Sequence, residues 1–381
     1  MSSSNPMREQ ILATPSAALA AFDALERGAR LAVETPDIYR SRRVVLTGSG
    51  DSWFAAKAAE TAFWSDGGVA AEVRTPLEAG RYQSQLFPRR EIENALLVAL
   101  SNSGAAARVV EAAGLWKAAG GRVLAVTRNA EGRLAVTADR RLVLPVPELP
   151  SAPGFCPYVF ALLGLQLLAI RFGEVRMRIT MDEAQARRAG LRRHLGDIGE
   201  VIAALDAPAR AAAAGLADRR LFEFVGAGPN FAVAEYGAAK LLEASGRHAL
   251  ARDLEEWTHL NYFDAAPQEI ATVVVVPAGS VAESRALELV AYMHRLGRRL
   301  LLVGGGATAA LARSLGHAVL EITPPIAEGW SPLPTSAVLA LLAAHLSEQD
   351  GAEYGRGGKG PWADSSTAAT VQQSLLWEPG R

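Results

Sequence analysis

The same strand, turn and helix pattern occurs twice in this chain, and this repeat is the feature that most restricts the fold. Three pairs of segments match at offsets of 176 to 178 residues: Gly48–Gly50 with Gly226–Gly228, Leu97–Gly104 with Val273–Ser280, and Gly120–Val126 with Gly297–Val303. Apolar runs of strand length alternate with helical patterns in both halves. Because strands joined by helices pair in parallel and are covered on both faces, the sequence predicts an α/β protein of two tandem doubly wound units.

The chain of 381 residues is long enough for two such domains. We expect an N-terminal helix and linker over 1–40, a first unit over 41–175, connecting helices over 176–217, a second unit over 218–350 and a C-terminal tail over 351–381. The apolar run Leu162–Ile170 is shorter than the ~18 residues of a membrane span, so it predicts a buried helix and not a membrane contact.

Composition excludes several classes of protein. The formal net charge of −1 gives no bulk attraction to nucleic acid or to an anionic membrane. Cys156 is the single cysteine, so an internal disulfide framework and a cysteine-cluster zinc site are excluded. It could be a nucleophile, but a small buried residue is the favoured interpretation. The polar start shows no signal-peptide pattern, and we expect a cytoplasmic protein without cofactor or metal.

Small polar residues follow two predicted strands of the first unit. The run Leu96–Leu100 leads into Ser101-Asn102-Ser103-Gly104, and an earlier strand leads into Gly48-Ser49-Gly50-Asp51-Ser52. A helix is expected from Ala105 to about Ala119. Uncharged hydrogen-bond donors at the carboxyl end of a strand, beside the start of a helix, suit a phosphate monoester. Serine and asparagine also cap helices for purely structural reasons, so both interpretations of the loop are open.

A dinucleotide fold is excluded, and one phosphate site is expected. Trp53 stands where the third glycine of a Gly-x-Gly-x-x-Gly motif would fall. In the second unit, Pro277-Ala278-Gly279-Ser280 replaces the serine-rich loop, and Pro229-Asn230 replaces Asp51-Ser52. The second unit has therefore lost most of its hydroxyl donors, which indicates one phosphate site per chain.

The second unit contains acid and base groups that the first lacks. Glu243 follows Lys240 on a predicted helix, and His259 ends the segment Asp253–His259. A carboxylate and an imidazole beside a sugar phosphate can carry out aldose–ketose chemistry, in which one base moves a proton between adjacent carbons. Taken singly, Glu243 is also compatible with a solvated helix face, and His259 with a capped or packed histidine.

These motifs resemble the tandem sugar isomerase (SIS) family. That family has Gly-x-Gly-x-Ser and Ser-x-Ser-Gly loops, matched by Gly48–Ser52 and Ser101–Gly104. The chain looks most like the isomerase half of glutamine–fructose-6-phosphate aminotransferase and the SIS-type glucosamine-6-phosphate deaminases. Lys240–Glu243 and Glu256–His259 match the motifs of that half without a gap between them.

The resemblance implies an SIS-type, flavodoxin-like fold and a set of roles. Gly50, Ser52, Ser101, Asn102 and Ser103 would bind the substrate phosphate. Three further residues would be catalytic. Glu243 would shuttle a proton between C1 and C2, His259 would open the sugar ring in the site of a neighbouring subunit, and Lys359 would close over the sugar. A homodimer acting on a phosphorylated amino sugar is implied.

The chain departs from the family around the expected sugar. Ala105 and Ala106 stand where the family has Glu-Thr, and Gly154-Phe155-Cys156 where it has Ser-Thr-Lys. We therefore expect isomerisation coupled to deamination, with a fructosamine-6-phosphate deglycase as the alternative and a non-catalytic sugar-phosphate sensor as an alternative of another class. With no glutaminase domain ahead of the first unit in this sequence, no glutaminase activity is expected of the chain.

Overall fold

A computed structural model of the chain describes residues 5–362 and 371–377. The chain divides into two compact units, each described here by itself. Unit A consists of Ala17–Glu148, Cys156–His194 and Gly358–Arg381, and unit B consists of Met1–Ser16, Leu149–Phe155 and Leu195–Gly357. Unit B therefore includes the start of the chain and the seven-residue stretch Leu149–Phe155, which lies in the sequence between two segments of unit A.

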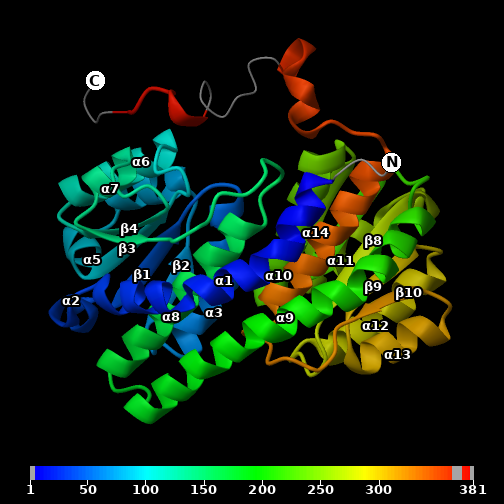
Figure 1. Cartoon of the computed structure of the whole chain (residues 1–381), viewed down its shortest axis with the longest axis horizontal. Coiled ribbons are helices and arrows are strands. Elements are labelled where there is room, and N and C mark those ends of the chain that lie inside the picture. The colour runs from blue at the N-terminus through cyan, green and yellow to red at the C-terminus, as the bar shows by residue number, and fades with distance from the viewer. Residues whose placement is uncertain (1–4, 363–370, 378–381) are drawn as a thin grey trace. The chain divides into compact units, whose positions relative to one another are not determined.

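Each unit contains one parallel sheet of five strands, and the two sheets have the same topology (Figure 1). The first has the order β2-β1-β3-β4-β5 and the second the order β10-β9-β8-β6-β7. Numbered from the first strand of each sheet, both orders are 2-1-3-4-5, the flavodoxin-like order. The strands are β1 Arg43–Thr47, β2 Ala70–Val73, β3 Ala95–Leu100, β4 Arg122–Thr127, β5 Arg140–Val143, β6 Leu221–Gly226, β7 His248–Asp253, β8 Ile270–Val276, β9 Arg299–Gly304 and β10 Ala318–Glu321. The predicted fold class is confirmed.

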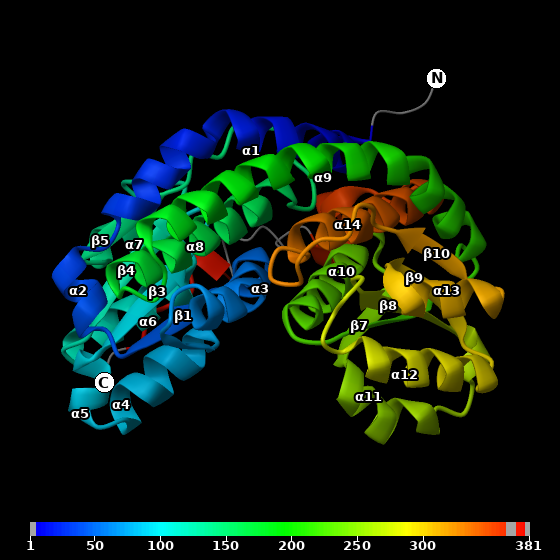
Figure 2. The same ribbon diagram turned by 90° about the horizontal axis from the view of Figure 1, so that it is seen from below.

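Helices connect the strands and cover both faces of each sheet (Figure 2). In the first half they are α1 Pro6–Leu31, α2 Thr35–Arg40, α3 Asp51–Ser65, α4 Ser84–Leu86, α5 Arg89–Glu93, α6 Ala107–Ala118, α7 Arg133–Thr137 and α8 Cys156–Val175. In the second they are α9 Met181–Gly215, α10 Pro229–Ser245, α11 Leu254–Leu260, α12 Glu283–Arg295, α13 Gly306–Ser314 and α14 Pro332–Gln349. Short α2 occupies part of the segment expected to be a linker.

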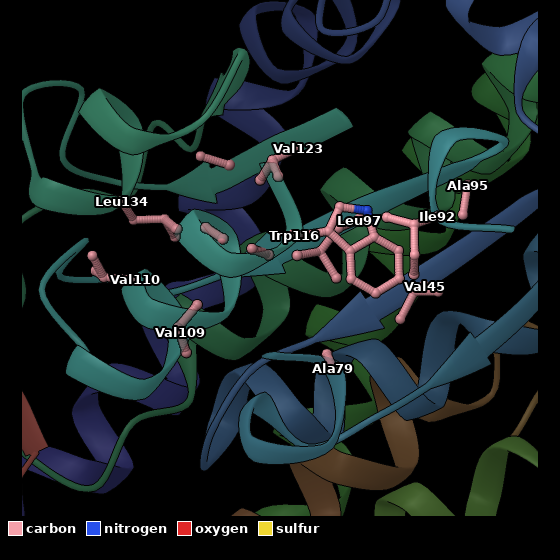
Figure 3. Packing of buried hydrophobic residues seen from close by; sticks show 13 residues of the cluster. Val45, Ala79, Ile92, Ala95, Leu97, Val109, Val110, Trp116, Val123 and Leu134 are labelled. Carbon is pink, nitrogen blue, oxygen red and sulfur yellow. The ribbon is translucent and has the colours of Figure 1, made fainter. Parts of the chain in front are cut away.

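The first sheet packs against α6 through alternate strand residues. Val45, Leu97 and Val123 lie in one buried cluster with Trp116 of α6, whose side chain is fully buried (Figure 3). Successive strand residues point to opposite faces of a sheet, so Val44 and Leu96 are buried on the other face. Helices α3 and α8 cover that face and pack against each other. Burial on both faces explains why these strands are almost wholly apolar.

The second sheet is built in the same way. One face packs on α12, α13 and α11, with Trp257 of α11 and Met293 of α12 fully buried among strand valines and leucines. The other carries α10 and α14, which lie side by side (Figure 2).

Helix α8 is longer than the apolar run that predicted it. By length and composition, Cys156–Val175 could cross a membrane, but 89% of its most apolar window is buried inside the protein. It is a core helix of unit A, so the prediction of a buried helix is confirmed. Cys156, its first residue, is buried, as expected.

Candidate functional site

Two glycine turns place small polar residues at the carboxyl end of the first sheet. Gly50 precedes α3 with a φ of 58°, a left-handed conformation that favours glycine. A Cβ atom at Gly48 would lie 2.8 Å from the Cβ of Ser52, so the turn also needs a glycine there. Gly228 repeats the conformation before α10 with a φ of 54°, which shows that the two halves share this local structure.

The Ser101–Gly104 loop is a tight turn and does not cap the following helix. The N–H of Gly104 donates to the carbonyl of Ser101 at 3.0 Å, and Gly104 has a φ of 69°. Helix α6 begins at Ala107, later than expected, and its N-cap residue Ala106 makes no side-chain cap hydrogen bond. Ser103 Oγ accepts from the N–H of Ala105 at 3.3 Å. The helix-cap interpretation of the loop is therefore wrong for α6.

Two buried polar atoms at this edge have no hydrogen-bond partner among the residues that the structure describes. They are Oγ1 of Thr47, the last residue of β1, and Oδ1 of Asn102. A buried polar atom without a partner is costly, and such atoms mark places where a ligand or water completes the structure. Together with Ser52 and Ser101 they form what we call the cradle, a group of polar side chains at the carboxyl ends of the paired strands β1 and β3.

The matching loop of the second sheet is filled by a carboxylate of the protein itself. Glu328 Oε1 accepts from the Oγ of Ser280 at 2.5 Å, and its Oε2 accepts from the N–H of Val281 at 3.2 Å. Asn230, which stands where the first half has Ser52, is buried and donates to the Oγ of Ser331 at 2.9 Å. Glu328 thus bonds Ser280 and Val281, which correspond to Gly104 and Ala105 at the end of the serine-rich loop of the first unit.

Glu243 lies near the end of α10 and is bonded to a lysine from the buried side of the helix. Lys240 Nζ lies 2.6 Å from Glu243 Oε2, and the two side chains are 2% and 50% exposed. The lysine therefore fixes one carboxylate oxygen while the carboxylate as a whole stays accessible. Sequence reasoning assigned no role to Lys240, although its position three residues before Glu243 signals contact on a helix.

Tyr236, one turn earlier in α10, contacts Lys240. Its ring lies under the Lys240 ammonium, with Nζ 5.4 Å from the ring centre. Its hydroxyl donates to the carbonyl of Gly154 at 3.0 Å. The segment that differs from the family pattern is thus tied to the helix that carries Glu243. Phe155 and Cys156 are buried, so this segment turns no polar side chain outward.

His259 lies on α11 and is exposed. Its Nε2 is 3.4 Å from Glu255 Oε1, one helical turn away, and the two side chains are 63% and 53% exposed. Arg285 also bonds Glu255, and this arginine, with a smaller contribution from His259, holds the pKa of the Glu255 carboxyl below its ordinary value. No hydrogen bond or ion pair joins His259 to Glu243 in the parts of the chain that the structure describes.

Helix α11 is fixed by a buried polar network at its base. Glu223 of β6 accepts from the indole N–H of Trp257 at 2.9 Å and from the Arg298 guanidinium at 2.9 Å. Arg298 also stacks over the Trp257 ring at 5.2 Å and donates to the carbonyl of Asn261. The side chain of Arg298 is completely buried. His259 is therefore carried by a rigid helix although it is itself exposed.

The C-terminal segment returns to unit A. Lys359 is exposed, and its backbone carbonyl accepts from the N–H of Trp362. Further on, the carbonyl of Gln372 accepts from Arg133 at 3.0 Å, and the Trp377 ring lies 5.6 Å from the Arg81 guanidinium carbon. Arg133 opens α7, and the next residue, Leu134, donates to the carbonyl of Gly104. Gln372 and Trp377 of the tail thus contact Arg133 of α7 and Arg81 in unit A.

The structure groups the predicted site residues into two sets. Gly50, Ser52, Ser101, Asn102 and Ser103 meet at one edge of the sheet in unit A, whereas Glu243 and His259 belong to unit B. Within residues 5–362 and 371–377, no group of three or more His, Cys, Asp or Glu side chains could hold a metal ion.

Comparison with known proteins identifies a domain family in the first half of the chain. Residues 37–171 match the SIS domain family. A glutamine–fructose-6-phosphate aminotransferase of Symbiobacterium thermophilum is 36% identical over 44% of the chain and 27% of its own length. The enzyme of the same name from Pyrococcus horikoshii is 27% identical over 80% of the chain and 48% of its own length. The chain spans about half or less of the length of these curated relatives.

Solved structures share the fold across nearly the whole chain. The C-terminal domain of glucosamine-fructose-6-phosphate aminotransferase from Francisella tularensis has a TM-score of 0.76 at 18% identity, covering 91% of this chain and 97% of that one. Tagatose-6-phosphate ketose/aldose isomerase from Escherichia coli has a TM-score of 0.71 at 16% identity, with 100% and 99% covered. Glucosamine-6-phosphate deaminase from Thermotoga maritima has 0.65 at 18% identity, with 90% and 94% covered.

The protein is therefore an α/β protein of the SIS type. Its first half contains an SIS domain, and the chain is homologous to the isomerase part of the glutamine–fructose-6-phosphate aminotransferases.

Proposed function

We propose that the protein is a sugar-phosphate enzyme that isomerises a phosphorylated amino sugar and releases its amine. For glucosamine 6-phosphate, the reaction would consume one water and yield fructose 6-phosphate and ammonia. The observation that carries the proposal is the Lys240–Glu243 pair, because a half-exposed carboxylate fixed by a buried cation is suited to proton transfer and unnecessary for binding alone. This is also the argument against a non-catalytic sensor.

In this mechanism the cradle holds the phosphate. The hydroxyls of Ser52, Ser101 and Ser103 and the amide of Asn102 would donate to its oxygens, together with the backbone N–H of Ser52 in the first turn of α3. The two unpartnered atoms, Thr47 Oγ1 and Asn102 Oδ1, support a polar occupant there. Because Glu328 fills the matching loop of unit B, one such site per chain is expected.

Glu243 would take a proton from one of the two reacting carbons and return it to the other. His259 would handle the hydroxyl proton during ring opening, from within the site of a neighbouring subunit. Exposed apolar side chains beside it, Leu260 at 61% and Phe263 at 71%, support burial of this face by a second copy in a homodimer. Lys359 would reach the sugar from the tail. A cytoplasmic location fits these substrates.

A second candidate reaction is cleavage of a fructosamine 6-phosphate. Gly154 has no side chain, its carbonyl bonds Tyr236, and the two residues that follow are buried. The segment therefore offers a substrate no side-chain hydrogen bond, and this difference from the family pattern favours an amine larger than ammonia. The proton-transfer roles would be the same.

The test is incubation with glucosamine 6-phosphate, with ammonia and fructose 6-phosphate measured in parallel, followed by a set of fructosamine 6-phosphates. Release of both products supports the deaminase, and turnover of the adducts alone supports the deglycase. If no substrate of either kind turns over while the sugar phosphates still bind, the protein is the sensor and our proposal is wrong.

A further inference from the structure

One hollow of unit B lies apart from all the residues discussed above. It has a volume of about 480 Å³, within the range of small-molecule pockets. The last two turns of α9 form one wall, and the first residues of β9 together with β10 form the other. β10 is an edge strand of the second sheet, and α10, which carries Glu243, packs along β6 and β7 towards the other edge.

The walls of the hollow are apolar, and their small residues leave it open. Helix α9 contributes Ala211, Ala212 and Gly215, whose short side chains create the space against the sheet. The strands contribute leucine and valine side chains. Such a surface is suited to the apolar body of a ligand, since covering it removes hydrocarbon from water.

Among the side chains that the structure describes, the one charged side chain that lines the hollow is that of Arg299, and His317 adds a ring that can donate a hydrogen bond. Arg299 and His317 line the hollow, and no acidic side chain does. Arg299 Nη2 donates to the carbonyl of Gly215 at 3.2 Å, and no carboxylate pairs with this arginine among the described residues. His317 Nε2 lies 3.0 Å from Nδ1 of His294, so one ring nitrogen is already engaged and the other is available.

We propose that this hollow binds a small organic anion, with its apolar body against α9 and its single carboxylate or sulfonate group at Arg299 and His317. Charge complementarity selects an anion, because Arg299 presents several N–H donors in a fork and a carbonyl is its sole partner in the described chain. The site is independent of the phosphate cradle and does not rest on the proposed reaction.

The test uses the fluorescence of anilinonaphthalene sulfonate, an anionic aromatic probe, with neutral N-phenylnaphthylamine for comparison. We expect one equivalent of the sulfonate per chain, displaced by hexanoate but unaffected by inorganic phosphate. Ala212→Trp fills the hollow and should abolish binding of both probes. Ala214→Trp is the matched control, because Ala214 is exposed on the same helix but does not line the hollow. Arg299→Gln should weaken the sulfonate at least about tenfold and leave the neutral probe unchanged.

Several results would overturn the proposal. The hollow is not the site if Ala212→Trp binds the sulfonate as wild type does. If Arg299→Gln weakens the binding of the anionic and the neutral probe equally, the hollow does not prefer anions. A sulfonate signal that falls as protein concentration rises, with a matching rise in mass by light scattering, would show that a second copy covers the hollow. Circular dichroism of each variant separates loss of binding from loss of folding.

Discussion

At the scale of single residues, two carboxylates of unit B are used in different ways. Lys240 bonds Glu243 from the buried side and leaves the carboxylate half exposed, whereas Glu328 is spent on filling a loop. The first arrangement leaves a group available to a substrate. The second satisfies donors that would otherwise need an anion or water.

The role of Glu328 predicts a loss of stability when it is removed. In Glu328→Ala, the hydroxyl of buried Ser280 and the N–H of Val281 lose their acceptor, which should cost about 1–3 kcal/mol in urea unfolding. Added phosphate should recover part of this in the variant more than in wild type. Glu321→Ala, which removes a surface partner of Arg313, should cost less than about 1 kcal/mol. Equal costs in the two variants would contradict the account.

His317 predicts a dependence of stability on pH. Burial, followed by the charges of His294 and Arg299, lowers the pKa of His317 from its ordinary 6.5. The unfolded chain therefore takes up a proton near pH 6.5 that the folded protein accepts only at lower pH. Unfolding free energy should fall as the pH drops below about 6.5, until His317 is protonated in the folded state as well. His317→Asn should flatten this fall; an unchanged slope would contradict the prediction.

Residue identities at the cradle could be predicted from the sequence, but their partners could not. Ser101 and Ser52 follow strands, and strand ends of a parallel sheet lie at one edge. Helix boundaries are predicted less well than the helices themselves. Helix α6 begins two residues later than expected, because nothing in the local sequence distinguishes Ala105 from Ala107 as a helix start. Glu328 meets Ser280 across 48 residues of sequence, and no local pattern signals such a contact.

At the scale of elements, α11 shows how an exposed side chain is positioned by a buried network. Seven residues form too short a helix to be stable alone. Asp253 caps it by accepting from the N–H groups of Glu255 and Glu256, and Trp257 anchors it to Glu223 and Arg298. The capping aspartate can be read from the sequence. The partners of Trp257 come from β6 and the start of β9, so only the fold brings them together.

Removing one member of this buried network should be costly. Arg298→Leu leaves the Glu223 carboxylate without its cation and should lower the unfolding free energy by about 3–5 kcal/mol. Arg313→Leu, which breaks an exposed ion pair with Glu321, is the control and should cost less than about 1 kcal/mol. Chemical denaturation of both variants checks this. A loss for Arg298→Leu no larger than the control would mean that the network does not hold α11.

At the scale of the whole molecule, duplication accounts for the architecture. Both sheets have the order 2-1-3-4-5 and both begin their first helix with a glycine of nearly equal φ. The repeated sequence offsets made this predictable. That Leu149–Phe155 belongs to unit B could not be predicted, because a short loop has no hydrophobic periodicity that would show which domain it packs against.

The proposed dimer gives a test that depends on which subunit supplies which group. Glu243→Gln and His259→Asn should each be inactive. If His259 serves the neighbouring site, a mixture re-formed at equal amounts should regain about a quarter of wild-type activity, because half of the dimers are mixed and each has one intact site. Each variant re-formed alone is the control. No recovery in demonstrated mixed dimers would show that both groups act within one chain.

The central claim is that Glu243 moves a proton between adjacent carbons of a sugar phosphate held by the cradle. The most direct measurement is nuclear magnetic resonance of fructose 6-phosphate incubated with the protein in deuterated water. We predict deuterium at C1 with wild type, and exchange slowed by at least about a hundredfold in Glu243→Gln, with calorimetric affinity for the sugar phosphate nearly unchanged. Exchange as fast in Glu243→Gln as in wild type would contradict the account.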